Sequence, residues 1–417
     1  MPLDVVVGAQ WGDEGKGKVV DCLNDQFRYG VVIRFQGGAN AGHTIEVNGQ
    51  KHVLHLIPSG ILTPDTLNLM GAGLVVDPIA LLDEVHALRS NGIEIKGRLY
   101  LSALAHWILP THQYLDRALE QSRTGRHIGS TMRGIGPAYQ DKMARIGLRV
   151  GDFLRSDFIT RYRRLRDYHY SLLEVLGYEE VPTIRQEEEW FEAIHHLQEL
   201  IRVDVEQLLW EQLKEGKSVL AEGAQGVLLD VSYGTYPYVT SSHTIAPSSL
   251  VGAGVSHRFV RNVIGVLKAY TTRVGEGPFP TELHGEAAEH LRQAGGEFGA
   301  TTARPRRVGW IDLEALRFAV RISGCNQLVM TKVDVLAGLQ EVPVGVAYLR
   351  NGQEISFGEF LIGQEVDKVT YHYLSGWDSV TADNHMLEVY IEYIEQAIGV
   401  PIVMVSTGPE RESFWRR

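Results

Sequence analysis

Residues 12–18 (GDEGKGK) form the part of the sequence best suited to phosphate chemistry. They match the pattern G-x-x-x-x-G-K, in which the amides of a glycine loop, a helix N-terminus and a lysine hold phosphate oxygens. The hydroxyl residue that usually follows this lysine and binds magnesium is replaced by Val19. Asp13 inside the loop is therefore the expected oxygen donor for a metal ion, or a base. A tight strand-to-helix turn with exposed lysines is the alternative interpretation.

Residues 36–44 (QGGANAGHT) form a second glycine-rich loop, after an apolar run at 31–35. Small residues allow the backbone to approach a ligand, and His43 is a ready proton donor. Because both loops would follow strands of one sheet, we expect them at the same edge, where α/β proteins usually bind ligands. A histidine is more often structural or solvated, and the chain has 16 of them. Only its glycine-rich setting favours a functional role for His43.

Residues 331–334 (TKVD) resemble the guanine-reading motif of GTP-binding proteins. The carboxylate of Asp334 could accept hydrogen bonds from guanine N1–H and the exocyclic amine, while the stem of Lys332 lies over the purine ring. Taken alone, the string is more typical of a solvated loop. Beside a phosphate loop it favours a guanine nucleotide.

Two basic segments have the composition of anion-binding loops. The guanidiniums of Arg304, Arg306 and Arg307 follow two threonines and could capture carboxylates or phosphates. Residues 128–145 likewise combine glycines, hydroxyls and basic side chains. The alternatives are a solvated basic turn for the first segment and a surface loop for the second.

Short apolar runs alternate with helical patterns, which predicts an α/β fold with a central, mostly parallel sheet flanked by helices. Strands are expected at 3–7, 31–35, 218–223, 263–270, 327–331 and 402–406, and a hairpin around Asn48-Gly49. Helices are expected from about Lys16 and at 78–91, 111–123, 155–176, 185–215, 312–323 and 385–398. No sharp boundary divides the chain. We therefore expect one domain over 1–417, with hairpin and helical insertions and a helix-rich subregion at about 155–215.

The composition argues against several classes of protein. The chain of 417 residues carries 40 basic and 51 acidic side chains, and its net charge of −11 disfavours a general nucleic-acid-binding surface. Two cysteines are too few for a disulfide framework. The sequence has neither a signal-peptide pattern nor an apolar run of about 18 residues. These features predict a soluble, cytoplasmic protein without nucleic-acid or membrane partners.

Together, these strings closely resemble the adenylosuccinate synthetase family. The matching segments, in the family order, are QWGDEGKGK (10–18), GGANAGHT (37–44), LHLIPSGIL (54–62), TMRGIGPAYQDK (131–142), EGAQG (222–226), GTYPYVTSS (234–242), TRVGEGPFPTEL (272–283), TKVDVL (331–336) and STGPER (406–411). The resemblance implies a magnesium-dependent ligase that joins L-aspartate to inosine monophosphate (IMP) with GTP. Its products would be adenylosuccinate, GDP and phosphate, in the first committed step from IMP to AMP.

The resemblance also implies catalytic roles. Asp13 would remove the proton from N1 of IMP, so that O6 attacks the γ-phosphorus of GTP and forms 6-phosphoryl-IMP. His43 and Lys16 would offset the charge that builds on GDP, and Gln225 would complete the catalytic group. L-aspartate would then displace phosphate at C6. Mg²⁺ would be held by Asp13 and the main-chain carbonyl of Gly42.

The resemblance further implies three sets of ligand contacts. GTP would contact Gly12, Asp13, Glu14, Gly15, Lys16, Gly17, Lys18, Gly42, His43, Thr44, Arg306, Lys332, Val333, Asp334, Ser406, Thr407 and Gly408. IMP would contact Asp13, Glu14, Gly15, Lys16, Asn40, Ala41, Gly42, His43, Thr131, Arg145, Gln225, Thr240 and Arg304. L-aspartate would be captured by Ala300, Thr301, Thr302, Ala303, Arg304, Pro305 and Arg306.

A homodimer is implied as well, because Arg145 matches an arginine that reaches IMP bound in the partner subunit. The aspartate loop departs from the family pattern T-T-G-R-R-R-R, since Ala303 and Pro305 replace a glycine and an arginine. Both residues are expected to stiffen the loop and to alter its closing rate and its aspartate affinity. A regulatory GTPase and a simple nucleotide kinase are the rival functions. A GTPase would leave the EGAQG, GTYPYVTSS and arginine-loop segments without a role, and a kinase would need no aspartate.

Overall fold

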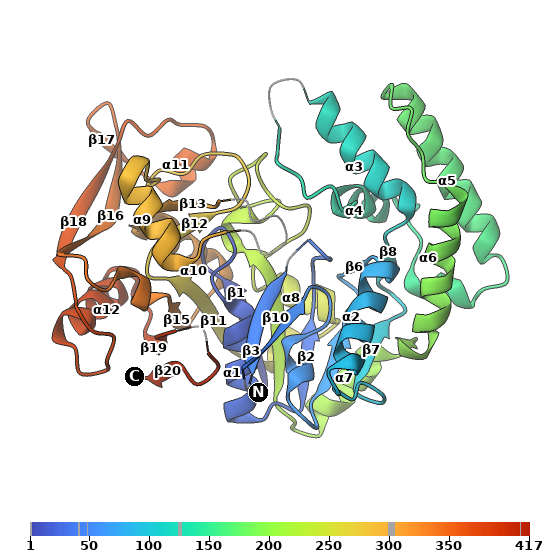
Figure 1. Ribbon diagram of the computed structural model, residues 1–417, viewed down its shortest axis with the longest axis horizontal. Helices are drawn as coiled ribbons and strands as arrows, with labels where there is room; N and C mark the ends of the chain where they lie inside the picture. Colours follow the sequence, from blue (N-terminus) through green and yellow to red (C-terminus); the bar gives the residue numbers. More distant parts are fainter. Residues whose placement is uncertain (1, 41, 48, 124–126, 299–304, 409) are drawn as a thin grey trace.

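The computed structural model describes residues 2–417 except 41, 48, 124–126, 299–304 and 409. Its centre is a ten-stranded sheet in which β19 and β20 pair antiparallel and the other neighbours run parallel (Figure 1). Across the sheet the strands are β20 (Phe414–Arg416), β19 (Ile402–Ser406), β15 (Gln327–Thr331), β11 (Val260–Lys268), β1 (Leu3–Gly8), β10 (Val219–Gly226), β2 (Val31–Arg34), β5 (Leu67–Met70), β7 (Leu99–Ser102) and β9 (Ile201–Arg202). The predicted α/β fold with a mostly parallel central sheet is confirmed.

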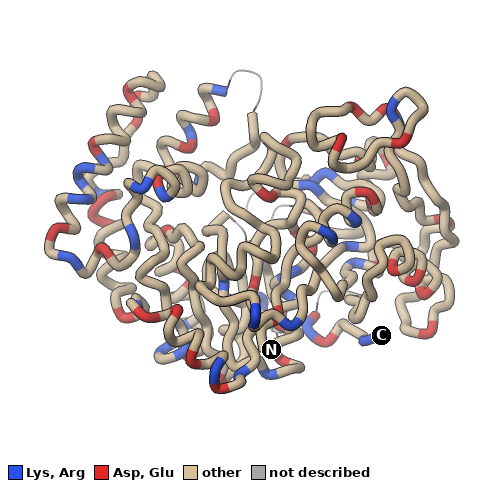
Figure 2. Tube along the Cα trace, turned by 180° about the vertical axis from the view of Figure 1, so that it is seen from behind, with Lys and Arg blue, Asp and Glu red and all other residues tan. Residues whose placement is uncertain are grey.

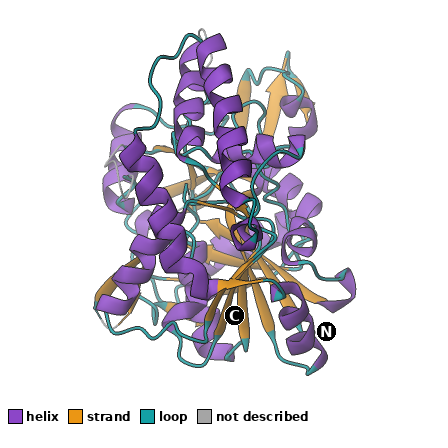
Figure 3. Ribbon diagram, turned by 90° about the vertical axis from the view of Figure 1, so that its right-hand side faces the viewer, coloured by secondary structure: helices purple, strands orange, loops and turns teal. Residues whose placement is uncertain are grey.

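Helices cover both sides of this sheet (Figure 3). The inner strands are consequently buried on both faces, and every residue of β1 and β2 is buried. The helices are α1 (Lys16–Phe27), α2 (Pro78–Ser90), α3 (Pro110–Ser122), α4 (Ile135–Ala144), α5 (Phe158–Val175), α6 (Ile184–Leu197), α7 (Val205–Lys214), α8 (Ser248–Ala253), α9 (Gly285–Gly295), α10 (Leu313–Ser323), α11 (Phe357–Leu361) and α12 (His385–Ile398). Six of the predicted helices are confirmed, namely α1, α2, α3, α5, α10 and α12.

Smaller sheets extend the structure beyond the central one. A four-stranded sheet contains β14 (Ile311–Asp312), β16 (Glu341–Arg350), β17 (Gln353–Ile355) and β18 (Lys368–Ser375). Three strand pairs are β3 (His43–Val47) with β4 (Gln50–Leu54), β6 (Val75–Val76) with β8 (His106–Trp107), and β12 (Thr271–Arg273) with β13 (Arg307–Gly309). The pair β3–β4 confirms the predicted hairpin.

The helix predicted at 185–215 is wrong as one continuous segment. The structure divides it into α6 and α7, with the short strand β9 between them. Ile201 and Arg202 are extended because they pair in parallel with Leu101 and Ser102 of β7, at the outer edge of the central sheet. Hydrogen bonding to an open strand edge thus prevails over local helical periodicity.

The parallel register brings the predicted site segments to one edge of the sheet. Gly8 at the end of β1 pairs with Gly226 of β10, and Lys268 of β11 pairs with Thr331 of β15. The loops that follow these strands therefore emerge together, as expected at the carboxyl edge of a parallel sheet.

Acidic and basic residues are interspersed along the chain rather than gathered by sign (Figure 2). Within the described part of the chain, no helix combines the length and the apolar character needed to cross a membrane.

Candidate active site

The loop between β1 and α1 contains left-handed backbone conformations. Gly12, Asp13 and Gly15 have φ angles of 91°, 59° and 88°, and Gly15 is the N-cap of α1. Glycine adopts this region without strain, whereas a residue with a Cβ atom rarely does. Strain at a residue such as Asp13 is a frequent property of functional sites.

The carboxylate of Glu14 is enclosed by this loop and is fully buried. It accepts hydrogen bonds from the N–H groups of Gln10 at 3.1 Å and Gly12 at 2.9 Å. The Nζ atom of Lys16 donates to it at 2.6 Å. The charge of this carboxylate therefore orders the loop and fixes Lys16. Because the side chain is buried and already bound, any contact of Glu14 with a ligand would have to come from its main chain.

Gln225 connects the second glycine loop with the end of β10. Its Nε2 donates to Oδ1 of Asn40 at 3.1 Å, and its Oε1 accepts from Nε2 of Gln36 at 3.3 Å. A Cβ atom at Gly226 would lie 2.1 Å from the carbonyl oxygen of Gln10. Only glycine allows β10 to approach the phosphate loop so closely, and so three predicted ligand-binding segments meet here.

The C-terminal segment 406–408 lies against α1. Nζ of Lys18 donates to Oγ of Ser406 at 2.8 Å and also to the carbonyl oxygen of Gly408. The same amino group lies 4.3 Å from the centre of the Phe414 ring. Burial lowers the pKa of Lys18 to about 8. The structure thus brings Lys18, near the start of the chain, together with Ser406 and Gly408, near its end. All three were predicted to bind GTP, as was Thr407, which lies between the last two in the sequence.

The TKVD motif follows β15 and contacts the phosphate loop. Oγ1 of Thr331 donates to the carbonyl oxygen of Glu14 at 2.7 Å. Nζ of Lys332 donates to the carbonyl oxygen of Gly295 at 2.8 Å, at the end of α9. Val333 is buried and Asp334 is half-buried. The motif is therefore held at the edge of the sheet where the sequence predicts it.

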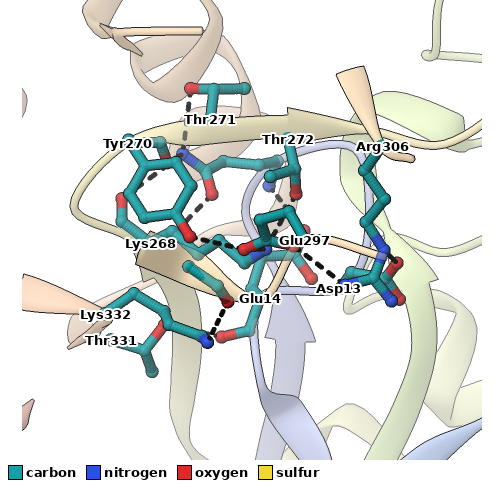
Figure 4. Close-up of polar contacts among 12 residues, drawn as sticks. Asp13, Glu14, Lys268, Tyr270, Thr271, Thr272, Glu297, Arg306, Thr331 and Lys332 are labelled. Carbon is teal, nitrogen blue, oxygen red and sulfur yellow. Dashed lines mark hydrogen bonds and ion pairs between the residues drawn. The ribbon is translucent and has the colours of Figure 1, made fainter. Parts of the chain in front are cut away.

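Arg306 lies between Asp13 and a second carboxylate, that of Glu297 (Figure 4). Its Nε is 2.8 Å from Oδ2 of Asp13, and its Nη1 donates to Oε2 of Glu297 at 2.8 Å. Oε1 of Glu297 accepts from Nζ of Lys268 at 2.6 Å and from the hydroxyl of Tyr270 at 2.5 Å. Burial would raise the pKa of Glu297, but the charge of Lys268 outweighs it and holds the pKa at about 2. Asp13 remains accessible, with 29% of its side chain exposed.

The elements around α4 form another side of the candidate site. The hydroxyl of Tyr139 accepts from the N–H of Gly37 at 2.9 Å and donates to the carbonyl oxygen of Gly73 at 2.8 Å. Thr131 precedes α4 and Arg145 caps its end with a φ of 65°; both residues are exposed. Among the described residues, no hydrogen bond or ion pair connects Thr131 or Arg145 with the phosphate loop.

The other predicted ligand residues have varied positions. The main chain of His43 begins β3, and Thr240 is half-buried. Three more are exposed: Gly42, Thr44 and Pro305. Outside the described residues lie Ala41, Ala300, Thr301, Thr302, Ala303 and Arg304.

A cluster with the composition of a metal site lies away from the phosphate loop, between α3, α4 and α5. It consists of His112, Asp141 and His169, the one such group in the part of the chain that the structure describes. Imidazole nitrogens suit zinc or copper better than magnesium, which prefers oxygen. Of the two residues predicted to bind magnesium, Asp13 lies in the phosphate loop with a partly exposed carboxylate, and Gly42 is an exposed residue of the second glycine loop.

Comparison with known proteins agrees with this geometry. Residues 5–415 match the family model described as adenylosuccinate synthetase. The chain belongs to the adenylosuccinate synthetase family. The adenylosuccinate synthetase of Christiangramia forsetii is 46% identical over 421 residues, which cover 99% of each chain. That of Parabacteroides distasonis is 47% identical over 419 residues, covering 99% of this chain and 98% of its own.

A solved structure shows the same likeness. The fully ligated adenylosuccinate synthetase from Plasmodium falciparum is 35% identical, covers 100% of both chains and has a TM-score of 0.92. Adenylosuccinate synthetases are ligases of AMP biosynthesis that use GTP, IMP and aspartate. Neither the regulatory GTPase nor the simple kinase receives support from these comparisons.

Two buried groups beside the phosphate loop were missed by the sequence analysis of this adenylosuccinate synthetase family member. Lys268 had a detectable signal, because a lysine that ends an apolar strand needs a buried partner. Glu297 gave no such signal, since an acidic residue before an arginine-rich loop has many possible partners. Its role becomes visible only when α9 is placed against β11.

Proposed function

We propose that this chain ligates L-aspartate to IMP at the carboxyl edge of its central sheet, with Asp13 as the base. The observation that carries the proposal is the position of Asp13, which is partly exposed inside the phosphate loop and paired with Arg306. Glu14, the neighbouring acid, is enclosed and bound by the loop itself. Asp13 is thus the carboxylate of this loop that can reach a bound nucleotide.

In this mechanism, the carboxylate of Asp13 accepts the proton from N1 of IMP. Electron density moves to O6, which attacks the γ-phosphorus of GTP and gives 6-phosphoryl-IMP. L-aspartate then forms a bond to C6 as phosphate leaves. Lys16 and His43 would oppose the negative charge that builds during phosphoryl transfer. Gln225 would orient the purine from the end of β10.

We propose magnesium as the metal ion of this site. Asp13 and the carbonyl of Gly42 offer the hard oxygen ligands that Mg²⁺ prefers, and Val19 leaves the usual hydroxyl position without a donor. When bound, Mg²⁺ would supply positive charge to the phosphate oxygens of GTP. The arrangement of Asp13 inside the loop supports this assignment.

The substrate contacts are proposed from the positions of their segments. GTP would lie along residues 12–18 and 42–44, with its guanine near 332–334 and 406–408. IMP would contact residues 13–16, 40–43, Thr131, Gln225, Thr240, Arg304 and, from the partner subunit, Arg145. L-aspartate would be held by residues 300–306. The contacts of Lys18 with Ser406 and Gly408 support the shared nucleotide site.

We further propose that the active form is a homodimer. Arg145 is exposed at the end of α4 and has no described contact with the phosphate loop of its own chain. An exposed arginine without a described contact to its own phosphate loop is available to complete the site of a second copy. We propose that the chain acts as one domain, because strands from both ends of the sequence share the central sheet. The two free, buried cysteines fit the reducing cytoplasm.

One assay tests the reaction. Purified protein is mixed with GTP, IMP and magnesium, and adenylosuccinate absorbance is followed with and without L-aspartate. The proposal predicts formation of adenylosuccinate that depends on all three substrates. Aspartate-independent turnover would favour a simple kinase, and slow GTP hydrolysis that needs neither IMP nor aspartate would favour a regulatory GTPase.

A further inference from the structure

Glu297 follows α9 and is almost completely buried, with 1% of its surface exposed. Both of its carboxylate oxygens are used: Oε1 accepts from Lys268 and Tyr270, and Oε2 accepts from Arg306. The main chain adds a further link, because the N–H of Arg306 donates to the carbonyl oxygen of Glu297 at 2.9 Å. Arg306 is therefore attached to Glu297 through both its backbone and its guanidinium.

This cluster is attached to the central sheet through Lys268. Lys268 ends β11, is 1% exposed and also donates to Oγ1 of Thr272 at 2.9 Å. A buried carboxylate is strongly unfavourable unless cations and hydrogen-bond donors compensate for it. The arrangement of Lys268, Tyr270 and Arg306 around Glu297 supplies both kinds of compensation. The guanidinium of Arg306 is consequently fixed with respect to β11.

The opposite side of the same guanidinium meets Asp13. Nε of Arg306 is 2.8 Å from Oδ2 of Asp13, whereas Nη1 is bound to Glu297. The planar guanidinium can hold two carboxylates in one geometry, which a lysine could not do. The position of Glu297 therefore determines where the positive charge lies beside Asp13.

We infer that Glu297 is a positioning residue for the ligation, which acts on Asp13 by anchoring Arg306. This inference rests on the proposed role of Asp13 as the base. A purely structural Glu297 would stabilise α9 against β11 without influencing the chemical step. The two roles differ in one measurable respect. A positioning residue loses its effect on turnover once Arg306 is absent, whereas a structural residue keeps it.

The test is a double-mutant cycle of Glu297→Gln and Arg306→Leu, each variant first shown to be folded by circular dichroism. Glutamine keeps the shape of the side chain but removes the charge that holds Arg306. We expect Glu297→Gln to lower kcat about 10- to 100-fold, as a displaced catalytic contact does, with the affinity for IMP nearly unchanged. In the Arg306→Leu background, the same substitution should change kcat less than about twofold.

Two further variants make the result decisive. Tyr270→Phe removes one donor to Glu297 without removing a charge, and it should lower kcat by a smaller factor, about 2- to 10-fold, only when Arg306 is present. This variant replaces Glu297→Gln in the cycle if the latter does not fold. Glu286→Gln, which changes an exposed glutamate of the preceding helix α9, is the matched control and should leave kcat unchanged.

The failure of this inference can be separated from the failure of the proposed function. If the wild-type protein forms no adenylosuccinate, or Asp13→Ala keeps full activity, the proposed function is wrong. If the wild type is active and Asp13→Ala is not, two results overturn the inference alone. They are a wild-type kcat in both Glu297→Gln and Tyr270→Phe, or equal losses of kcat with and without Arg306.

Discussion

Two nearly buried carboxylates, Glu297 and Asp141, lie on different sides of the proposed site, and the groups that bind them differ in kind. Glu297 is 1% exposed and is bound by Lys268 and Arg306 beside the central sheet. Asp141 of α4 is 6% exposed and lies among helices. The first cluster contacts Asp13 through Arg306, whereas in the second cluster Asp141 belongs to the helix that Arg145 caps.

Two histidines bind Asp141. The N–H of Leu109 donates to Nδ1 of His112 at 2.9 Å, so the proton of His112 is on Nε2, which lies 2.9 Å from Oδ2 of Asp141. Nε2 of His169 lies at the same distance from that oxygen, and its Nδ1 is 2.6 Å from the hydroxyl of Thr111. Each imidazole can thus donate to Asp141 while it accepts on its other nitrogen.

The two carboxylates have similar pKa values for different reasons. For Asp141, burial would raise the pKa, but the hydrogen bonds from His112 and His169 outweigh it and hold the pKa at about 2. For Glu297, the charge of Lys268 has the same result. Burial also lowers the pKa of His112. The comparison teaches that the cluster beside Asp13 is held by the cationic side chains of Lys268 and Arg306, whereas the cluster in the helical region is held by hydrogen bonds from two histidines.

The largest expected effect concerns the residue that the first cluster meets. Asp13→Ala should lower kcat about 10²- to 10⁴-fold, because a general base contributes that much to proton transfer. The adenylosuccinate assay measures the loss, and gel filtration should show that the oligomeric state is unchanged. Asp157→Ala, which removes an exposed aspartate from a surface ion pair with Arg155, is the matched control. Turnover near the wild-type rate in Asp13→Ala would refute the role of Asp13 as base.

Disrupting each cluster should also lower the free energy of unfolding by a different amount. Lys268→Met leaves Glu297 buried beside one cation fewer and should lower the free energy of unfolding by about 3–5 kcal/mol. His169→Leu removes one hydrogen-bond donor to the charged Asp141 and should cost about 1.5–3 kcal/mol. Urea denaturation measures both changes, with Lys96→Met at an exposed position as the control. The opposite order of the two costs would contradict the proposed difference between the clusters.

The sequence was sufficient to predict six of the ten strands of the central sheet and the loops at its edge. Apolar runs such as 3–7 and 31–35 are long enough and bounded clearly enough by glycines to identify buried strands, and their order places the loops that follow at one edge. Asp13 was identified because its charge is unexpected inside a phosphate loop. These features are local, and a local pattern is sufficient to reveal them.

Other features depend on contacts between distant segments. Glu297, Lys268 and Arg306 are brought together only when the residues that follow α9 pack against the end of β11, and no spacing in the sequence specifies that contact. The strand β9 was missed because its two residues are held extended by β7, a partner about 100 residues earlier in the chain. The helix expected at 185–215 was wrong for the same reason.

Mild acid should distinguish the two clusters. The pKa of His112 in the folded protein lies below its ordinary value of 6.5, so the folded state binds fewer protons and loses stability as the pH falls below 6.5. The contributions of Glu297 and Asp141 are complete only above about pH 5, and they are lost as the pH falls through the ordinary pKa values of 4.5 and 3.8 toward the folded values of about 2.

Between pH 7 and 5, stability should therefore decrease by at most about 1.4 kcal/mol per pH unit for His112. Thermal unfolding at several pH values measures this slope. His112→Gln removes the titrating group and should make the slope shallower, whereas a change of the exposed His257 to glutamine should not. An equal slope in wild type and His112→Gln would show that this histidine does not confer the acid sensitivity.

The smallest expected effect concerns Arg145, at the end of α4. It tests whether this residue completes the site of a second copy of the chain. Asp13→Ala and Arg145→Leu should each be nearly inactive alone, but a mixture that exchanges subunits should recover about one quarter of wild-type activity. Half of the dimers in such a mixture are hybrids, and each hybrid contains one site in which Asp13 and the partner subunit's Arg145 are both intact. A mixture of Asp13→Ala with the double variant Asp13→Ala/Arg145→Leu is the control and should recover nothing. If subunit exchange is demonstrated and activity does not return, Arg145 acts within its own chain, and α4 supports the same site as Glu297.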